Sequence, residues 1–259
     1  MEKNFKSKDL ILFIPARSGS TRIKNKNLQK IGKRSLIQNK IKVCLETNLG
    51  PVIVSTNSKK IAKVAKRSGA IIPYLRPKII SNSNSPMISA VIHLIKFYSK
   101  KKIKLPKYIG VFPATNPFVK KKSIINSFNR IKKNDQFNSI VTIHKSNDDP
   151  FMLIAKNKKR ILFNIFNYKN LNYSKFERSQ DRPTFFKMSS SIQITKTKYF
   201  YKFFNKDLTK LREAAFDIKS CISYEISKKE AYDINTPFDL FLLKYLKSRK
   251  KITEMVLNR

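Results

Sequence analysis

The sequence predicts an α/β fold built around a mostly parallel sheet. Short apolar runs recur as far as residue 144, and the segments between them have apolar residues at helical spacing. The best defined run, residues 10–14, is continuous and ends at Pro15, which is typical of a buried strand. Strands that alternate with helices in this way pair in parallel through right-handed crossovers.

The predicted elements follow one another in a regular order. Apolar runs predict strands at residues 10–14, 51–56, 70–73, 108–112 and 139–144. Helical spacing predicts helices at residues 35–46, 61–65, 86–98 and 123–131, the second of which ends before Gly69. Beyond residue 144 the pattern is less regular, with strands predicted at residues 191–195 and 221–226 and a helix from about Pro237. Because ligands bind at the carboxyl ends of parallel strands, we expect the loops after Ile14, Thr56 and Phe112 to share one cleft.

The loop after the first strand has the composition of a phosphate-binding loop. Small residues at 18–20 allow backbone N–H groups to approach an anion, and Arg22, Lys24 and Lys26 follow closely. A surface loop in a Lys-rich chain would also be positive. Two observations favour phosphate binding: the loop leaves a buried strand, and it uses Arg, whose planar fork fits phosphate oxygens, in a chain that otherwise uses Lys. The Walker A pattern is absent.

Composition limits the classes of protein to be considered. The 259-residue chain has a net charge of +40, but the cations are spread throughout and no zinc-finger, basic-zipper or RNA-binding signature is present. We therefore expect no specific nucleic-acid partner. Hydrophobic residues make up 41%, enough for a core, yet no apolar run has the length of a membrane span. The two cysteines, Cys44 and Cys221, lack metal-ligand spacing and indicate buried thiols in the cytoplasm.

The segment IPARSGSTRIKNKN resembles the amino-terminal signature of CMP-sugar synthetases that activate nonulosonic acids, I-P-A-R-x-G-S-K-x-I-x-x-K-N. Further motifs of that family follow in order: V-S-T-N-S at residues 54–58, L-R-P at 75–77, A-T-N-P at 114–117, R-S-Q-D at 178–181 and D-I-N-T-P-F-D at 233–239. Each motif alone is weak, but the ordered set is specific. The resemblance implies a three-layer, Rossmann-like fold of the nucleotide-diphospho-sugar transferase type with an inserted dimerisation arm.

The resemblance also implies a reaction. A cytidylyltransferase of this family joins CTP to a nonulosonic acid, a sialic-acid-like sugar, and releases the CMP-sugar and pyrophosphate for surface glycan biosynthesis. The alternatives are the same reaction on another acid sugar such as Kdo, and a nucleotide-binding homologue without turnover. A basic nucleic-acid-binding protein is a third class, and it predicts binding that falls steeply with salt.

The site residues are expected to divide into two groups. Arg17 and Lys26 would contact the triphosphate, because phosphoryl transfer depends on charge neutralisation and alignment. The sugar carboxylate needs a cation or a hydrogen-bond donor, which Arg178 or Lys187 could supply, with Gln180 as a neutral contact. The nucleotide-binding set is Ala16, Arg17, Ser18, Gly19, Arg22 and Asn27.

The acidic motif near the carboxyl end is the candidate metal site. Asp233 is the expected ligand and catalytic carboxylate, because Mg²⁺ prefers carboxylate oxygen. Asp233 could instead cap the following helix, although Thr236 can fill that position. Asn235 stands where the family has a second acidic residue. Its amide oxygen could coordinate Mg²⁺ without adding charge, so we expect weaker metal affinity.

The domain organisation is expected to be a nucleotide-binding core interrupted once. Residues 1–146 and 196–259 form the predicted core, and residues 147–195 form the insertion. By resemblance, this insertion supplies a homodimer interface and part of the sugar pocket. His93 falls on the apolar face of a predicted helix and is expected to be a packing residue, while His144 at a strand end could face the sugar.

Overall fold

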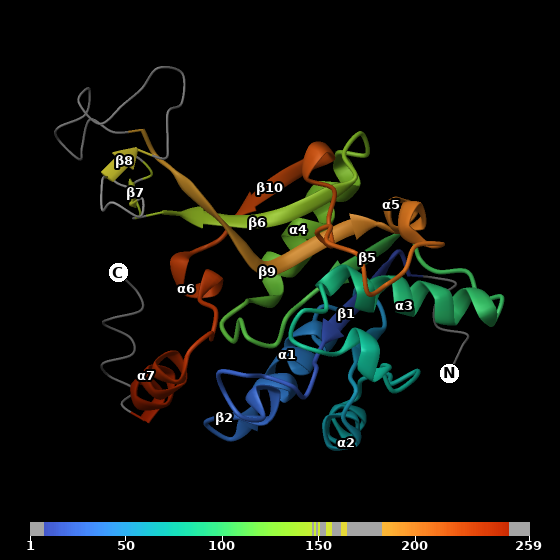
Figure 1. Cartoon of the computed structure of the whole chain (residues 1–259), viewed down its shortest axis with the longest axis horizontal. Helices are drawn as coiled ribbons and strands as arrows, with labels where there is room; N and C mark the ends of the chain where they lie inside the picture. The colour runs from blue at the N-terminus through green and yellow to red at the C-terminus, as the bar shows by residue number, and fades with distance from the viewer. Residues whose placement is uncertain are drawn as a thin grey trace.

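A six-stranded sheet forms the centre of the structure, with its strands in the order β10-β6-β9-β5-β1-β4 (Figure 1). The computed structural model describes residues 8–146, 148, 150, 154–156, 162–164 and 183–248. The sheet strands are β1 (Leu10–Pro15), β4 (Val52–Ser55), β5 (Tyr108–Val111), β6 (Ser139–Lys145), β9 (Phe186–Lys196) and β10 (Cys221–Glu225). Two small hairpins pair β2 (Lys30–Ile31) with β3 (Arg34–Ser35) and β7 (Ile154–Lys156) with β8 (Leu162–Asn164).

The five helices that the sequence predicts are confirmed among the described residues, and two short helices, α5 and α6, were not predicted. They are α1 (Leu36–Leu45), α2 (Lys59–Arg67), α3 (Met87–Lys100), α4 (Lys121–Lys133), α5 (Thr197–Phe200), α6 (Lys228–Ala231) and α7 (Pro237–Ser248). Among the described helices, none is both long enough and apolar enough to cross a bilayer.

Helices cover both faces of the sheet, which explains why β1 is a continuous apolar run. Leu10, Leu12 and Ile14 point into a core shared with α1, α2, α4 and α7. The alternate residues Ile11 and Phe13 point into a second core with α3 and α5. All five side chains are fully buried, and each such burial contributes roughly 1.5–3 kcal/mol. The predicted three-layer, mostly parallel α/β fold is confirmed.

One strand of the sheet, β9 (Phe186–Lys196), runs against the others. β9 lies between β5 and β6 and pairs antiparallel with both. Residues 186–195, the last part of the segment expected as an insertion, therefore lie in the central sheet. Because β9 pairs with strands that are far away in the sequence, no local sequence pattern predicts its place in the sheet. Most of the remaining expected insertion lies outside the described residues.

The prediction of a strand at residues 70–73 is wrong. In this described segment, Ile71 forms an isolated bridge with Ile53, and Leu75 forms another with Thr56. Pro73 lies between the two bridges and has no N–H to donate to a ladder. The segment is therefore extended along β4 without becoming a regular strand, and it ends with Arg76 N donating to Thr56 O at 2.7 Å.

Gly50 tests how tightly the chain packs against the start of β1. A Cβ at this position would lie 1.8 Å from the backbone oxygen of Leu10. Because a backbone atom cannot move aside cheaply, Gly50→Ala should lower the free energy of unfolding by at least about 1–3 kcal/mol. Urea denaturation measures the change. Gly19→Ala is the matched control, since its Cβ would meet nothing within 4 Å, and equal losses in both variants would contradict the packing argument.

Candidate active site

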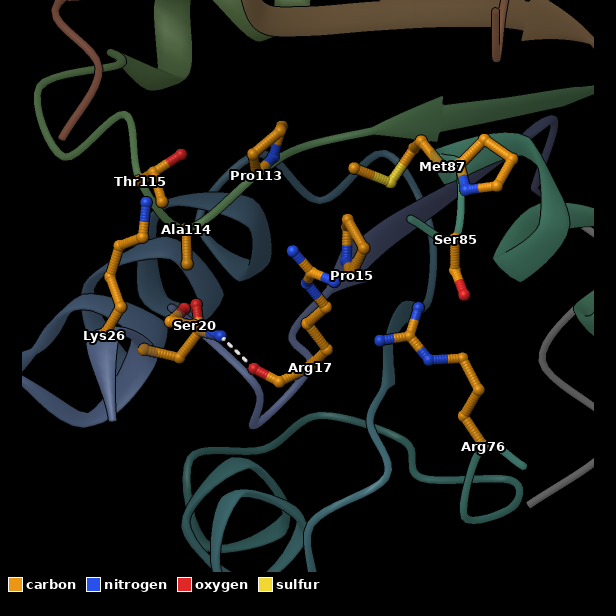
Figure 2. Close-up of a pocket in the computed structure, with 12 residues that line it drawn as sticks. Pro15, Arg17, Ser20, Lys26, Arg76, Ser85, Met87, Pro113, Ala114 and Thr115 are labelled. Atoms are coloured by element: carbon orange, nitrogen blue, oxygen red, sulfur yellow. Dashed lines mark hydrogen bonds between the residues drawn. The ribbon is translucent and has the colours of Figure 1, made fainter. Parts of the chain in front are cut away.

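The carboxyl ends of β1 and β5 open into a pocket of about 250 Å³, called the inner pocket here (Figure 2). Arg17 and Arg76 both reach into it, and Lys26 stands beside Ala114 and Thr115. Its lining consists of Pro15, Arg17, Ser20, Lys26, Asn27, Arg76, Ser85, Pro86, Met87, Pro113, Ala114 and Thr115. The loops after the first and fourth predicted strands therefore share a cleft, as expected.

The inner pocket continues into a second cavity of about 310 Å³, the cationic groove. The two share Arg17, Ser20 and Lys26. The groove is lined by Arg17, Ser20, Thr21, Arg22, Lys26, Ser83 and Asn235. Three cations and no carboxylate contribute to this lining, so it suits an extended polyanion.

Lys26 is half-buried, whereas Arg22 is exposed. Burial lowers the pKa of its ammonium, Asp233 acts in the opposite direction, and the charges of Arg22 and Arg17 lower it further. A phosphate group in the groove would supply the negative charge that this cluster lacks. The electrostatics therefore favour an anionic ligand.

The predicted phosphate-binding loop after β1, called the phosphate loop here, is held from outside the cleft by the loop after β4. Asn57 Oδ1 accepts hydrogen bonds from Ser18 N at 2.9 Å and from Ser18 Oγ at 3.2 Å. Ala16 N donates to Ser55 O at 2.9 Å. The expectation that the loop after Thr56 lines the cleft is therefore corrected: Asn57 holds the phosphate loop and does not line the inner pocket.

The other predicted nucleotide residues differ in their surroundings. Asn27 is buried and donates from Nδ2 to Arg17 O at 3.0 Å, so it shapes the loop. Arg17 itself donates from Nη1 to Asn82 O. Gly19 is exposed, and Arg22 is exposed along the groove.

A tightly held turn, residues 232–235, meets the phosphate loop. Lys26 Nζ donates to Ile234 O at 2.7 Å, and Ile234 N donates to Thr115 O at 3.0 Å. Asn116, which is fully buried, donates from Nδ2 to Tyr232 O at 3.2 Å. Two loops distant from it in sequence, those after β1 and β5, thus fix this acidic turn beside the cationic groove.

Within the acidic turn, the helix-capping role belongs to Thr236. Thr236 Oγ1 accepts from Asp239 N at 3.2 Å, and Asp239 Oδ2 accepts from Thr236 N at 2.7 Å, which is a reciprocal cap at the start of α7. Asp233 is not required for capping. Its Oδ2 accepts from Asn235 Nδ2 at 3.1 Å, and its Oδ1 is buried with no hydrogen-bond partner among the described residues.

These residues fit a metal that takes few protein ligands. The described residues hold no cluster of three His, Cys, Asp or Glu side chains suited to a metal ion. Mg²⁺ is commonly bound by one or two carboxylates together with substrate phosphates. The unpartnered Oδ1 of Asp233 and the amide oxygen of Asn235 meet that pattern at the edge of the cationic groove.

A third cavity of about 490 Å³, the outer pocket, lies on the other side of the acidic turn. It shares Asn235 with the cationic groove. The lining comprises His144, Ser146, Asp148, Lys187, Met188, Ser189, Ser190, Gln193, Lys228, Ala231, Asp233 and Asn235. The pocket is polar, and its titratable side chains are two lysines, an imidazole and two carboxylates, from Lys187, Lys228, His144, Asp148 and Asp233.

A bulge in β9 shapes the outer pocket. Val141 pairs with Gln193 while Thr142 pairs with Ser189, so residues 190–192 are extra in β9. Ile192 N donates to Thr142 Oγ1 at 3.2 Å in place of a ladder bond. Bulges commonly lie next to active sites because they redirect side chains, and this one brings Ser189 and Ser190 into the lining.

The predicted sugar-binding residues are only partly within view. Arg178 and Gln180 lie outside the described residues. Lys187 lines the outer pocket, where its Nζ pairs with Asp148 Oδ2 at 3.1 Å in an exposed contact. Lys228, which begins α6, also lines the pocket and was missed by sequence analysis. Its position just ahead of the acidic motif was the available signal.

Arg76 is a second residue that the sequence prediction did not place in the site. It is 7% exposed, and its Nε and Nη2 have no hydrogen-bond partner among the described residues. Burial lowers its pKa to about 10, with Tyr74 opposing and Arg17 adding to the shift, so it stays charged at pH 7. The L-R-P motif at residues 75–77 was the signal that could have identified it.

Comparison with known families agrees with this architecture. The sequence model of the family described as Cytidylyltransferase matches residues 11–252, which include all three cavities. The chain belongs to the cytidylyltransferase family. Among its relatives is the CMP-N,N'-diacetyllegionaminic acid synthase of Legionella pneumophila, 33% identical over 116 residues. That alignment covers 44% of this chain and 50% of the relative, so the chain matches about half the length of that protein.

Two further comparisons cover nearly the whole chain. The post-translational flagellin modification protein B of Campylobacter coli is 22% identical over 246 residues, covering 94% of this chain and 97% of the relative. A solved structure of CMP:2-keto-3-deoxy-manno-octonic acid synthetase complexed with CTP superposes with a TM-score of 0.66 at 13% identity. It covers 94% of this chain and 100% of its own, and it shows the shared fold.

Proposed function

We propose that this cytidylyltransferase joins CTP to a nonulosonic acid and releases the CMP-sugar and pyrophosphate. The observation that supports this most strongly is the sequence of three adjoining cavities. The inner pocket shares Arg17, Ser20 and Lys26 with the cationic groove, and the groove shares Asn235 with the outer pocket. The base would occupy the inner pocket, the triphosphate the cationic groove and the acceptor sugar the outer pocket, with the α-phosphate near Asn235, where the groove and the outer pocket meet.

The inner pocket suits a pyrimidine base. The guanidinium of Arg76 offers N–H donors only, and cytosine presents O2 and N3 as adjacent acceptors. Met87 and Pro113 supply apolar surface on the same pocket. With the base placed there, the triphosphate extends along the cationic groove past Arg17 and Lys26.

The reaction requires alignment and charge neutralisation. An acceptor hydroxyl oxygen forms a bond to the α-phosphorus, the bond from that phosphorus to the bridging oxygen breaks, and pyrophosphate leaves with those electrons. The hydroxyl proton is released to solvent. Lys26 has three N–H donors and uses one on Ile234 O, which leaves two for the phosphates. Arg17 and Lys26 would stabilise the charge on the transferring group.

Asp233 and Asn235 are the residues that would hold Mg²⁺. They stand where the cationic groove meets the outer pocket, so a metal held there would reach the α-phosphate. When bound, Mg²⁺ would neutralise phosphoryl oxygens and fix their orientation. The side chain of Asn235 adds an oxygen but no charge, which makes Asp233 the single anionic ligand of the turn.

The outer pocket would bind the acid sugar. Lys187 and Lys228 are the described cations available to its carboxylate, and the pair of Lys187 with Asp148 is exposed and weak enough to be exchanged for a ligand. Arg178 and Gln180 remain proposals, since they lie outside the described residues. The Legionella relative bears the name of a legionaminic acid synthase, which supports a nonulosonic acid as the acceptor.

Pyrophosphate release tests the function directly. The protein would be incubated with CTP, Mg²⁺ and legionaminic, pseudaminic or sialic acid, with Kdo as the competing acid sugar. We expect release with a nonulosonic acid. Preference for Kdo would reassign the acceptor. Absence of release with every sugar, together with retained CTP binding, would support the alternative of a homologue without turnover.

The phosphate loop gives the first activity prediction. Arg17→Ala should lower turnover by a factor of ~10² or more, because it removes a preorganised charge from the groove. Lys24→Ala is the matched control, since Lys24 is exposed and does not line the groove. Steady-state pyrophosphate release measures both. Equal losses of turnover in the two variants would mean that activity depends on the overall positive charge of the loop and that Arg17 has no defined contact with the substrate.

The acidic turn gives the second activity prediction, which concerns the Mg²⁺ requirement. A single carboxylate predicts an unusually high Mg²⁺ requirement, because ligand charge is a main determinant of affinity for a hard cation. Asn235→Asp should lower the Mg²⁺ concentration for half-maximal activity, and Asp233→Asn should abolish activity. A Mg²⁺ titration of each variant measures this.

Asn48→Asp is the control for added negative charge, because Asn48 is exposed and lies near the amino end of β1. It should leave the Mg²⁺ dependence unchanged. An unchanged titration for Asn235→Asp, combined with an active Asp233→Asn, would remove the metal from this turn.

We also propose that the protein is a homodimer and works in the cytoplasm. Phe186 and Met188, at the start of β9, are 48% and 50% exposed, and a second copy could cover this apolar strand end. The dimer arm expected over residues 147–195 leads directly into it. Cys44 and Cys221 are free thiols, as in a reducing compartment where CTP is available.

Sedimentation tests the assembly. The wild type should sediment as a dimer, and Phe186→Glu should shift it toward monomer by placing a charge in the apolar contact. Ile218→Glu is the control, because Ile218 is 67% exposed and lies away from the strand end. A monomeric wild type, or equal shifts in both variants, would contradict this interface.

A further inference from the structure

Behind Arg76 lies a cluster of buried polar groups that the proposed reaction does not use. It comprises Ser55 at the end of β4, Tyr74 and Arg76 in the segment beside β4, and His93 on α3. Ser55 Oγ, Tyr74 OH, Arg76 Nε, Arg76 Nη2 and His93 Nδ1 are all buried without a hydrogen-bond partner among the described residues. Buried polar atoms are normally satisfied, so five in one place point to bridging water.

The cluster is complementary in its chemistry. The guanidinium nitrogens of Arg76 can only donate, whereas the hydroxyls of Ser55 and Tyr74 can accept. The His93 ring packs edge-on against Tyr74, with ring centroids 4.4 Å apart. Burial lowers the pKa of His93, and the charges of Arg76, Lys100 and Lys96 lower it further, which favours the neutral ring, one of whose nitrogens can accept a hydrogen bond.

The position of Tyr74 is itself fixed. Its ring contacts Phe97, with centroids 5.0 Å apart, as well as His93. Burial raises the pKa of its hydroxyl, whereas the nearby Ser55 hydroxyl and the charge of Arg76 both lower it. Ser55 is fully buried in the sheet. The acceptors around Arg76 therefore lie on β4, on α3 and in the extended segment beside β4, while the guanidinium is part of the inner-pocket lining.

We propose that Tyr74 and His93 are positioning residues that hold Arg76 through bridging water and thereby set the preference of the inner pocket for cytosine over uracil. The inference rests on the proposed function, because it takes the inner pocket as the base site. Cytosine N3 accepts a hydrogen bond, whereas uracil N3 carries a proton. A fixed guanidinium, which only donates, cannot satisfy uracil N3–H. A guanidinium free to turn could avoid that group and contact O2 alone.

Binding of CTP and UTP to the whole protein tests the proposal without an acceptor sugar. Isothermal titration calorimetry with Mg²⁺ would compare wild type, Tyr74→Phe and His93→Leu. We expect the wild type to prefer CTP, and each variant to lose ~10-fold of that preference, mainly through tighter relative binding of UTP and weaker binding of CTP. His93→Asn should restore much of the preference, because its side-chain oxygen can replace Nδ1 as an acceptor.

Tyr108→Phe is the matched control. Tyr108 also has a buried hydroxyl without a partner among the described residues, but it begins β5, at the end of the sheet opposite the inner pocket. It should leave the CTP:UTP ratio unchanged. In turnover assays, Tyr74→Phe should raise KM for CTP while kcat at saturating CTP stays near the wild-type value.

Three outcomes would overturn the proposal: a wild type that binds CTP and UTP equally, an unchanged ratio in both Tyr74→Phe and His93→Leu, or an equal change in Tyr108→Phe. Failure of the proposed function is a separate result. A wild type that prefers CTP but never releases pyrophosphate would contradict the reaction, and a loss of preference in Tyr74→Phe would still support the positioning role.

Discussion

The hydrogen bond from Lys26 Nζ to Ile234 O is the interaction on which the arrangement of this site depends. It joins residues 208 positions apart and links the loop after β1 to the turn before α7. Thr115 O and the Asn116 side chain hold the same turn from the loop after β5. Two loops that begin on adjacent parallel strands thus position a carboxyl-terminal turn, and this keeps Asp233 at the edge of the cationic groove.

Polar groups with unmet bonding capacity mark the two ends of this site. At one end Arg76 has two donor nitrogens, and at the other Asp233 has a carboxylate oxygen, that find no hydrogen-bond partner in the part of the chain that the structure describes. Leaving such a group unsatisfied costs about 1–3 kcal/mol, a large share of the stability of a domain. Unsatisfied groups at both ends agree with the ligands that we propose for them, a base at the first and a metal at the second.

The sequence could predict what depends on local pattern. The strand at residues 10–14, the cationic loop after it and the helix cap at Thr236 each follow from a short segment. The place of β9 could not be predicted, because it depends on pairing with β5 and β6, which are far away in the chain. For the same reason the roles of Lys228 and Arg76 escaped prediction: each side chain enters its pocket only after distant elements have packed.

The most direct test of the central claim is a crystal structure of the protein with CTP, Mg²⁺ and an acceptor analogue that lacks the attacking hydroxyl. The account predicts cytosine against Arg76, the triphosphate along Arg17 and Lys26, and the α-phosphate beside Asp233 and Asn235. The analogue should lie in the outer pocket, facing that phosphate. A triphosphate bound away from the cationic groove, or an analogue bound outside the outer pocket, would contradict the account.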